Sequence, residues 1–180
     1  GEKIREIKRL CRVVLVSDDT VYALYGERVK KSLTEAGYSV CEFVFPHGED
    51  AKSLENFGKM QEFCAENSIT RTDLFVALGG GVTGDLTGFV ASTYLRGVDF
   101  VQIPTTVLAM VDSSVGGKTA INLNAGKNLC GAFHQPIAVF ADCETLETLP
   151  EETFNEGCAE IIKYGMILDA DFLTFLKDND

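Results

Sequence analysis

The pattern of hydrophobic and polar residues predicts that strands and helices alternate up to Pro104. Short apolar or β-branched runs indicate strands, and apolar residues at helical spacing indicate the helices between them. Such alternation predicts an α/β fold with a mostly parallel, Rossmann-like sheet and flanking helices, in which ligands bind at the carboxyl ends of the strands. The predicted strands are Arg12–Val16, Tyr38–Phe45, Asp73–Leu78 and Asp99–Ile103, and the predicted helices are Thr20–Ala36, Ser53–Asn67 and Asp85–Tyr94.

The character of the chain changes after Asp112. The segment Asp112–Gly131 is rich in Gly, Ser, Asn and Thr, which predicts a long irregular loop with a functional role. A strand is expected at Ile137–Ala141, a helix at Glu151–Leu168 and the start of another helix at Asp171–Leu176. We therefore expect a nucleotide-binding α/β domain over residues 1–150 and the beginning of a helical domain over residues 151–180.

Composition narrows the function classes. The 180 residues are 46% hydrophobic, enough for a core, yet no apolar run is long enough to cross a membrane, and the charged N-terminus does not resemble a signal peptide. A formal net charge of −11 argues against nucleic acid as a partner. The six cysteines form no C-x-x-C pair, which is typical of reduced intracellular thiols. We expect a cytoplasmic protein.

Basic residues are scarce in the middle of the chain. Between Asp73 and Leu176 there are 13 acidic residues and only four basic ones, three of which adjoin a glycine. Isolated cations in an acidic chain are typical of a site that binds an anion. These four residues are Arg96, Lys118, Lys127 and Lys163.

A glycine-rich loop supplies the most specific local motif. Gly79, Gly81 and Gly84 form G-x-G-x-x-G between a predicted strand and a predicted helix. Glycines there let the backbone approach a pyrophosphate at a helix N-terminus. A tight turn would explain one or two of these glycines, but hardly four in six positions. Asp99 lies near the spacing expected of a ribose-binding acid, but it opens a strand, and we interpret that spacing as a coincidence.

The order of motifs resembles the 3-dehydroquinate synthase family of sugar-phosphate cyclases. The resemblance rests on GGGVTGD, YLRG, QIPTTVLAMVDSSVGGKTAIN, GKNLCGAFHQP, TLETLP and GCAEIIKYG. It implies an NAD- and metal-dependent lyase of the shikimate pathway, which leads to chorismate and the aromatic amino acids. The substrate, 3-deoxy-arabino-heptulosonate 7-phosphate, is oxidised by NAD, loses phosphate, is reduced again and closes into a ring. The resemblance also implies a homodimer and a divalent metal, zinc or cobalt.

The resemblance also implies residue roles. Lys118 takes part both in the cofactor site and in catalysis. At i,i+3 spacing, Glu160 and Lys163 would otherwise indicate only a surface ion pair. The implied cofactor contacts are Asp18, Thr20, Glu49, Lys52, Gly80, Gly81, Val82, Gly84, Asp85, Thr105, Thr106, Lys118, Lys127, Thr145, Leu146 and Thr148. The implied catalytic residues are Arg96, Lys118 and Asn128 around the substrate phosphate and Asp112 and Lys163 near its hydroxyls, and the implied metal ligand is Glu160.

The metal site is incomplete in this sequence. A catalytic zinc generally needs three protein ligands, and we expect His47 and His134 to be structural or solvent-facing. In the family, two histidine ligands come from a C-terminal helical domain, so we expect the chain alone to bind metal weakly and not to turn over. Three alternatives stay open: another sugar-phosphate cyclase, a metal-dependent alcohol dehydrogenase that releases NADH, and a free-standing NAD-binding module.

Overall fold

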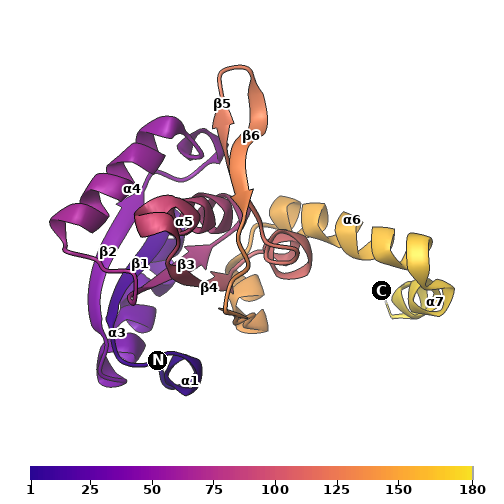
Figure 1. Ribbon diagram of the computed structural model, residues 1–180. Helices are drawn as coiled ribbons and strands as arrows, with labels where there is room; N and C mark the ends of the chain where they lie inside the picture. The colour runs from indigo at the N-terminus through magenta and orange to yellow at the C-terminus, as the bar shows by residue number, and fades with distance from the viewer. Residues whose placement is uncertain (180) are drawn as a thin grey trace.

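The computed structural model describes residues 1–179, and at its centre lies a five-stranded parallel sheet with strand order β2-β1-β3-β4-β7 (Figure 1). All four pairings in this sheet are parallel, as the alternating strand–helix pattern predicts. The five strands are β1 (Arg12–Asp18), β2 (Ser39–Phe45), β3 (Leu74–Gly79), β4 (Asp99–Pro104) and β7 (Ala138–Val139).

Helices cover both faces of the sheet. Alternate residues of β1 point to opposite sides, so Val14 and Val16 join one core cluster with α4 and α5, whereas Val13 and Leu15 join another with α1 and α3. The helices are α1 (Glu2–Ile7), α2 (Asp19–Val21), α3 (Glu27–Glu35), α4 (Leu54–Glu66), α5 (Gly81–Thr93), α6 (Glu151–Leu168) and α7 (Ala170–Asp178). Short 3₁₀ or π turns are η1 (Tyr22–Gly26), η2 (Glu49–Ala51), η3 (Tyr94–Arg96), η4 (Ala109–Ser113) and η5 (Cys143–Thr148).

The prediction of one irregular loop over Asp112–Gly131 is wrong. The segment contains an antiparallel hairpin of β5 (Lys118–Leu123) and β6 (Gly126–Phe133), which rises beside α5 in Figure 1. Buried Thr119 and Ile121 alternate with more exposed neighbours, and the many Gly and Asn residues obscure this period of two. The hairpin packs against α5, where Thr119 occupies the space that a side chain at Gly88 would need.

Helix α5 begins four residues earlier than the pattern predicts. The glycines disfavour a helix by propensity, and the sequence therefore indicates a turn from Gly79 to Gly81. Packing reverses this preference, because a Cβ at Gly84 would lie only 2.7 Å from Gln102 Oε1 of β4. The glycines thus let α5 lie close to the sheet.

Helices α6 and α7 extend away from the sheet (Figure 1). Several large apolar side chains on them are exposed, among them Leu168 at 81% and Met166 at 72%. The proposed division at residue 150 stays a prediction. Within residues 1–179, no helix is both long and apolar enough to cross a membrane.

Candidate functional site

The glycine loop lies at the carboxyl end of β3. Gly80 takes an extended conformation and precedes α5, whose N-terminus has no side-chain cap, so its first N–H groups are available to a ligand. The backbone here has little room for side chains. A Cβ at Gly80 would lie 3.3 Å from Thr106 Cγ2, and one at Gly81 would lie 3.1 Å from Ser113 Oγ. Glycine at both positions therefore keeps the approach to the helix N-terminus open.

Residues at the ends of neighbouring strands surround this loop. Asp18 closes β1, accepts a hydrogen bond from the Val21 N–H at 2.9 Å and lies 3.4 Å from the Thr83 hydroxyl. The Thr105 N–H donates to the Gly79 carbonyl at 3.1 Å. The buried Thr105 hydroxyl finds no partner within residues 1–179, and such a group needs one. By contrast, Thr20 is exposed.

A buried lysine links the helix to the hairpin. Lys52 is only 4% exposed, and its ammonium donates to Asp85 Oδ2 at 2.6 Å and to Asn128 Oδ1 at 2.5 Å. Burial raises the pKa of the Asp85 carboxyl, and the hydrogen bond and charge of Lys52 oppose that rise. Asp85 is thus held in place by a cation that solvent barely reaches.

A pocket of about 470 Å³ opens beside this pair, between α5, the hairpin and the turn after β4. It brings together four residues singled out from the sequence, two of them acidic, one basic and one an amide. The polar side chains lining it include Asp85, Asp112, Lys118 and Asn128. Carboxylates facing an ammonium and an amide can bind hydroxyl and phosphoryl groups on one small molecule.

Glu49 contacts the hairpin through Asn122 and Lys127. Glu49 Oε1 accepts from Asn122 Nδ2 at 2.8 Å and lies 3.9 Å from Lys127 Nζ. Asn122 was not singled out from the sequence. What marks Asn122 is the break in strand pairing between Ile121 and Leu123, which only the structure reveals.

Arg96 does not join Lys118 and Asn128 in this pocket. It is exposed, in the left-handed region with φ 72°, in the turn after the C-terminal end of α5. Within the described residues it makes no side-chain hydrogen bond or ion pair. Of the three residues, Lys118 and Asn128 thus line the same pocket, and Arg96 lies outside it.

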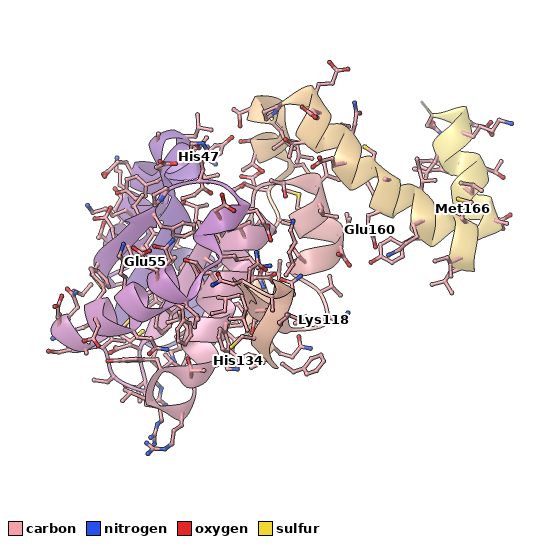
Figure 2. The ribbon with its side chains drawn as sticks, turned by 90° about the horizontal axis from the view of Figure 1, so that it is seen from above. His47, Glu55, Lys118, His134, Glu160 and Met166 are labelled. Atoms are coloured by element: carbon pink, nitrogen blue, oxygen red, sulfur yellow. The ribbon has the colours of Figure 1, made fainter. Side chains whose placement is uncertain are left out.

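Glu160 and Lys163 pair with each other on α6. Lys163 donates a hydrogen bond to Glu160, and this bond raises the pKa of the lysine. Figure 2 shows His47 and His134 well apart from Glu160. Exposed His47 forms a hydrogen bond with Asp19 Oδ1 at 2.8 Å, and the His134 ring stacks on Phe100. Residues 1–179 contain no group of three His, Cys, Asp or Glu able to hold a metal.

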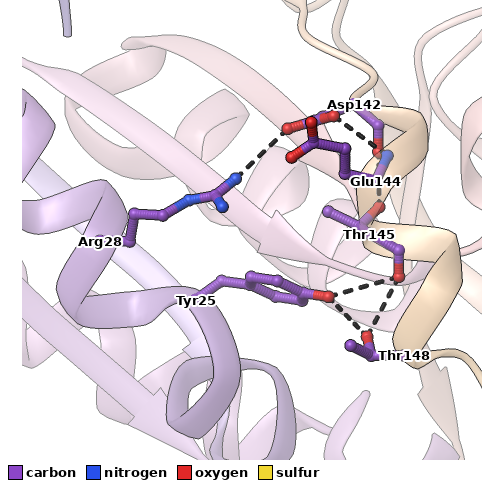
Figure 3. Close-up of polar contacts among 6 residues, drawn as sticks. All are labelled: Tyr25, Arg28, Asp142, Glu144, Thr145 and Thr148. Carbon is purple, nitrogen blue, oxygen red and sulfur yellow. Dashed lines mark hydrogen bonds and ion pairs between the residues drawn. The ribbon is translucent and has the colours of Figure 1, made fainter.

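The segment Cys143–Thr148 is anchored to η1 (Figure 3). The Tyr25 hydroxyl lies 2.5 Å from Thr148 Oγ1 and 3.4 Å from the Thr145 carbonyl, and Arg28 pairs with Asp142 at 3.3 Å. Buried Thr145 lines a second pocket of about 500 Å³ that also reaches Leu78 and Ile103 near the ends of β3 and β4. Leu146 is half-buried in this segment.

The fold and the glycine loop define a Rossmann-like α/β protein with a candidate dinucleotide loop beside a polar pocket. Residues 42–156 match the model of the 3-dehydroquinate synthase N-terminal domain, and the chain belongs to this family. The 3-dehydroquinate synthases of Desulforamulus reducens and Streptococcus pneumoniae are 51% and 49% identical over 93% and 100% of the chain. The chain spans only 47% and 51% of these relatives.

Solved structures of sugar-phosphate cyclases share the fold. A 2-deoxy-scyllo-inosose synthase, complexed with carbaglucose-6-phosphate, NAD⁺ and Co²⁺, matches 93% of the chain and 46% of its own length at 30% identity and a TM-score of 0.87. The 2-epi-5-epi-valiolone synthase of Streptomyces hygroscopicus, with NAD⁺ and Zn²⁺ bound, matches 89% of the chain and 45% of its own length, at 33% identity and a TM-score of 0.84. An iron-containing alcohol dehydrogenase of Thermococcus thioreducens, at 20% identity and a TM-score of 0.74, shares only the fold with this chain.

Proposed function

We propose that the whole protein to which this chain belongs is a 3-dehydroquinate synthase. It would convert 3-deoxy-arabino-heptulosonate 7-phosphate to 3-dehydroquinate and phosphate. The observation that carries the proposal is the near 50% identity to several 3-dehydroquinate synthases over almost the whole chain. The glycine loop beside the pocket of Lys118 and Asn128 supports it independently.

The residues at the glycine loop fit a bound NAD. Gly80 and Gly81 leave the space that a Cβ would fill, and the Thr105 hydroxyl needs a polar partner. When bound, NAD supplies a hydride acceptor that later returns the hydride. The chain's own part is to hold it, through Asp18, Thr20, Glu49, Lys52, Gly80, Gly81, Val82, Gly84, Asp85, Thr105, Thr106, Lys118, Lys127, Thr145, Leu146 and Thr148.

The pocket beside the loop would take the substrate. Lys118 offers a point charge and Asn128 an amide N–H to the phosphoryl group. Asp112, on the same pocket, would accept hydrogen bonds from substrate hydroxyls, and Lys163 on α6 would donate to them. Arg96 stays proposed as a phosphate contact, although its place outside this pocket leaves Lys118 and Asn128 as the anion-binding pair of one chain.

The described residues do not fit a complete metal site. Glu160 is one carboxylate, its charge is matched by Lys163, and both histidines lie elsewhere. We propose that Glu160 contributes one ligand to a divalent metal, zinc or cobalt, in the whole protein. On this basis, the 180-residue chain alone would not turn over.

The family resemblance supports two further parts of the proposal, a homodimer and a cytoplasmic location. Sedimentation equilibrium of the full-length protein tests the first, since a dimer has twice the mass of one chain.

A steady-state assay tests the activity. Full-length protein, given the heptulosonate phosphate and a catalytic amount of NAD, is expected to release one phosphate per substrate without net NADH. Phosphate release only from a different sugar phosphate would favour another cyclase, the class to which the two solved synthases belong. NADH accumulating in proportion to product would instead favour a dehydrogenase.

A further inference from the structure

The hairpin beside the pocket contains a large bulge. Ile121 pairs with Cys130 and Leu123 pairs with Gly126, so Asn122 alone faces the three residues Lys127–Leu129 on the other strand. The backbone of Asn128, inside this bulge, is left-handed with φ 57°. Extra residues in a bulge lose their ladder partners, and a non-glycine residue in this region must be held there by its surroundings.

Asn122 makes the bonds that hold the bulge. Its side-chain Oδ1 accepts from the Asn128 N–H at 2.8 Å, and its Nδ2 donates to Glu49 Oε1 at 2.8 Å. Its backbone N–H donates to the Lys52 carbonyl at 2.8 Å. One short amide side chain therefore acts as acceptor toward the bulge and donor toward the turn Glu49–Ala51, a combination that an ionised carboxylate, which only accepts, does not provide.

The bulge in turn orients the Asn128 side chain. Asn128 Oδ1 accepts from Lys52 Nζ, and the residue lines the pocket together with Lys118 and Asp112. With its carbonyl oxygen occupied by Lys52, Asn128 presents its amide N–H groups as the free end, which is the polarity an anion requires. In a regular ladder, Asn128 would be paired and extended, and its side chain would point to one of the two faces of the hairpin. The bulge frees it from that pairing and allows the left-handed conformation.

We propose that Asn122 is a positioning residue: it fixes the bulge so that Asn128 faces the phosphate pocket, and it holds the hairpin in register with the Glu49–Lys52 cofactor loop. This inference rests on the proposed function, in which Asn128 contacts the substrate phosphate. Asn122 itself lines neither the pocket nor the glycine loop, and acts through Asn128 and Glu49.

Three variants of the full-length protein test this. Asn122→Ala removes both side-chain bonds and is expected to raise KM for the sugar phosphate by about tenfold with a smaller change in kcat. Asn122→Asp keeps an acceptor for the Asn128 N–H, so KM should stay within about threefold of the wild type, while the new charge beside Glu49 weakens NAD binding. Asn124→Ala, at an exposed turn position with no side-chain hydrogen bond among residues 1–179, is the matched control.

Two results would overturn the proposal: a wild-type KM for Asn122→Ala with only a lower Tm, or the same KM increase for Asn122→Asp as for Asn122→Ala. If the wild type releases no phosphate, the proposed function fails, and calorimetric titration of inorganic phosphate into the NAD-loaded protein still tests Asn122. About tenfold weaker phosphate binding by Asn122→Ala than by the wild type supports the positioning role. Equal binding rejects it.

Discussion

The ammonium of Lys52 lies 2.6 Å from a carboxylate oxygen of Asp85, with both side chains largely out of solvent. Lys52 precedes α4 and Asp85 lies in the first turns of α5, so one ion pair ties the segment before α4 to the helix that follows the glycine loop. Removal of one partner from a buried pair leaves the other charge uncompensated, which costs far more than the loss of a surface pair.

Lys52→Met is therefore expected to destabilise the protein by about 3 kcal/mol, because Asp85 is left buried without its cation. Denaturant unfolding, followed by far-UV circular dichroism, measures the change. Lys59→Met is the matched control. Its exposed pair with Glu55 lies on the surface of α4, and its loss should cost less than about 0.5 kcal/mol. A Lys52→Met effect as small as the control's would contradict the structural role of the pair.

Gly81→Ala is expected to weaken NAD binding by at least about tenfold, because the new Cβ crowds Ser113 Oγ and shifts the start of α5. Isothermal titration of the full-length protein with NAD measures this. Gly58→Ala serves as the control, since a Cβ there meets nothing within 4 Å and lies inside α4. That control should bind NAD like the wild type and gain a little helix stability. If the wild type and both variants bound NAD with equal affinity, the glycine loop would not be part of the NAD site.

Lys118→Gln is expected to raise KM for the sugar phosphate by about tenfold or more, because the proposed function places the Lys118 charge against the phosphoryl group. Because a charge is removed, the dependence of KM on salt should also become weaker. The control is Lys31→Gln, since Lys31 is exposed on α3 and pairs with Glu35. It changes the net charge by the same amount as Lys118→Gln and should leave KM unchanged. Steady-state phosphate release measures both variants, and identical kinetics for the two would place the anion site elsewhere.

The cysteines should differ strongly in reactivity. Cys143 is exposed, whereas Cys64 is fully buried, and burial raises the pKa of its thiol to about 12. Since the thiolate is the reactive form, iodoacetamide near neutral pH should modify Cys143 quickly and Cys64 only after unfolding. Peptide mass spectrometry over time measures the order of labelling. Early modification of Cys64 in the native protein would show that the core beneath α4 opens readily.

The sequence allows prediction of the sheet and its helices because the strands carry continuous apolar runs, as in Val13–Val16 and Leu74–Leu78, and the helices carry apolar residues at helical spacing. The hairpin escapes prediction because its alternation is short and interrupted by Gly and Asn. The bulge at Lys127–Leu129 depends on the register of two strands, which no single run of residues encodes. Site residues were found through motifs, and motifs do not report geometry. They therefore group Arg96 with Lys118, although the structure places it outside the pocket, and they include Asn122 at the end of one motif without giving it a role.

We propose that the glycine loop holds NAD beside a pocket for a phosphorylated sugar. A single turnover of the NAD-loaded full-length protein with the heptulosonate phosphate, with NADH absorbance and free phosphate recorded together, tests this arrangement. We predict that NADH rises and returns to its starting level while one phosphate is released per substrate. NADH that rises and stays high, with no phosphate released, would exclude this arrangement of cofactor and substrate.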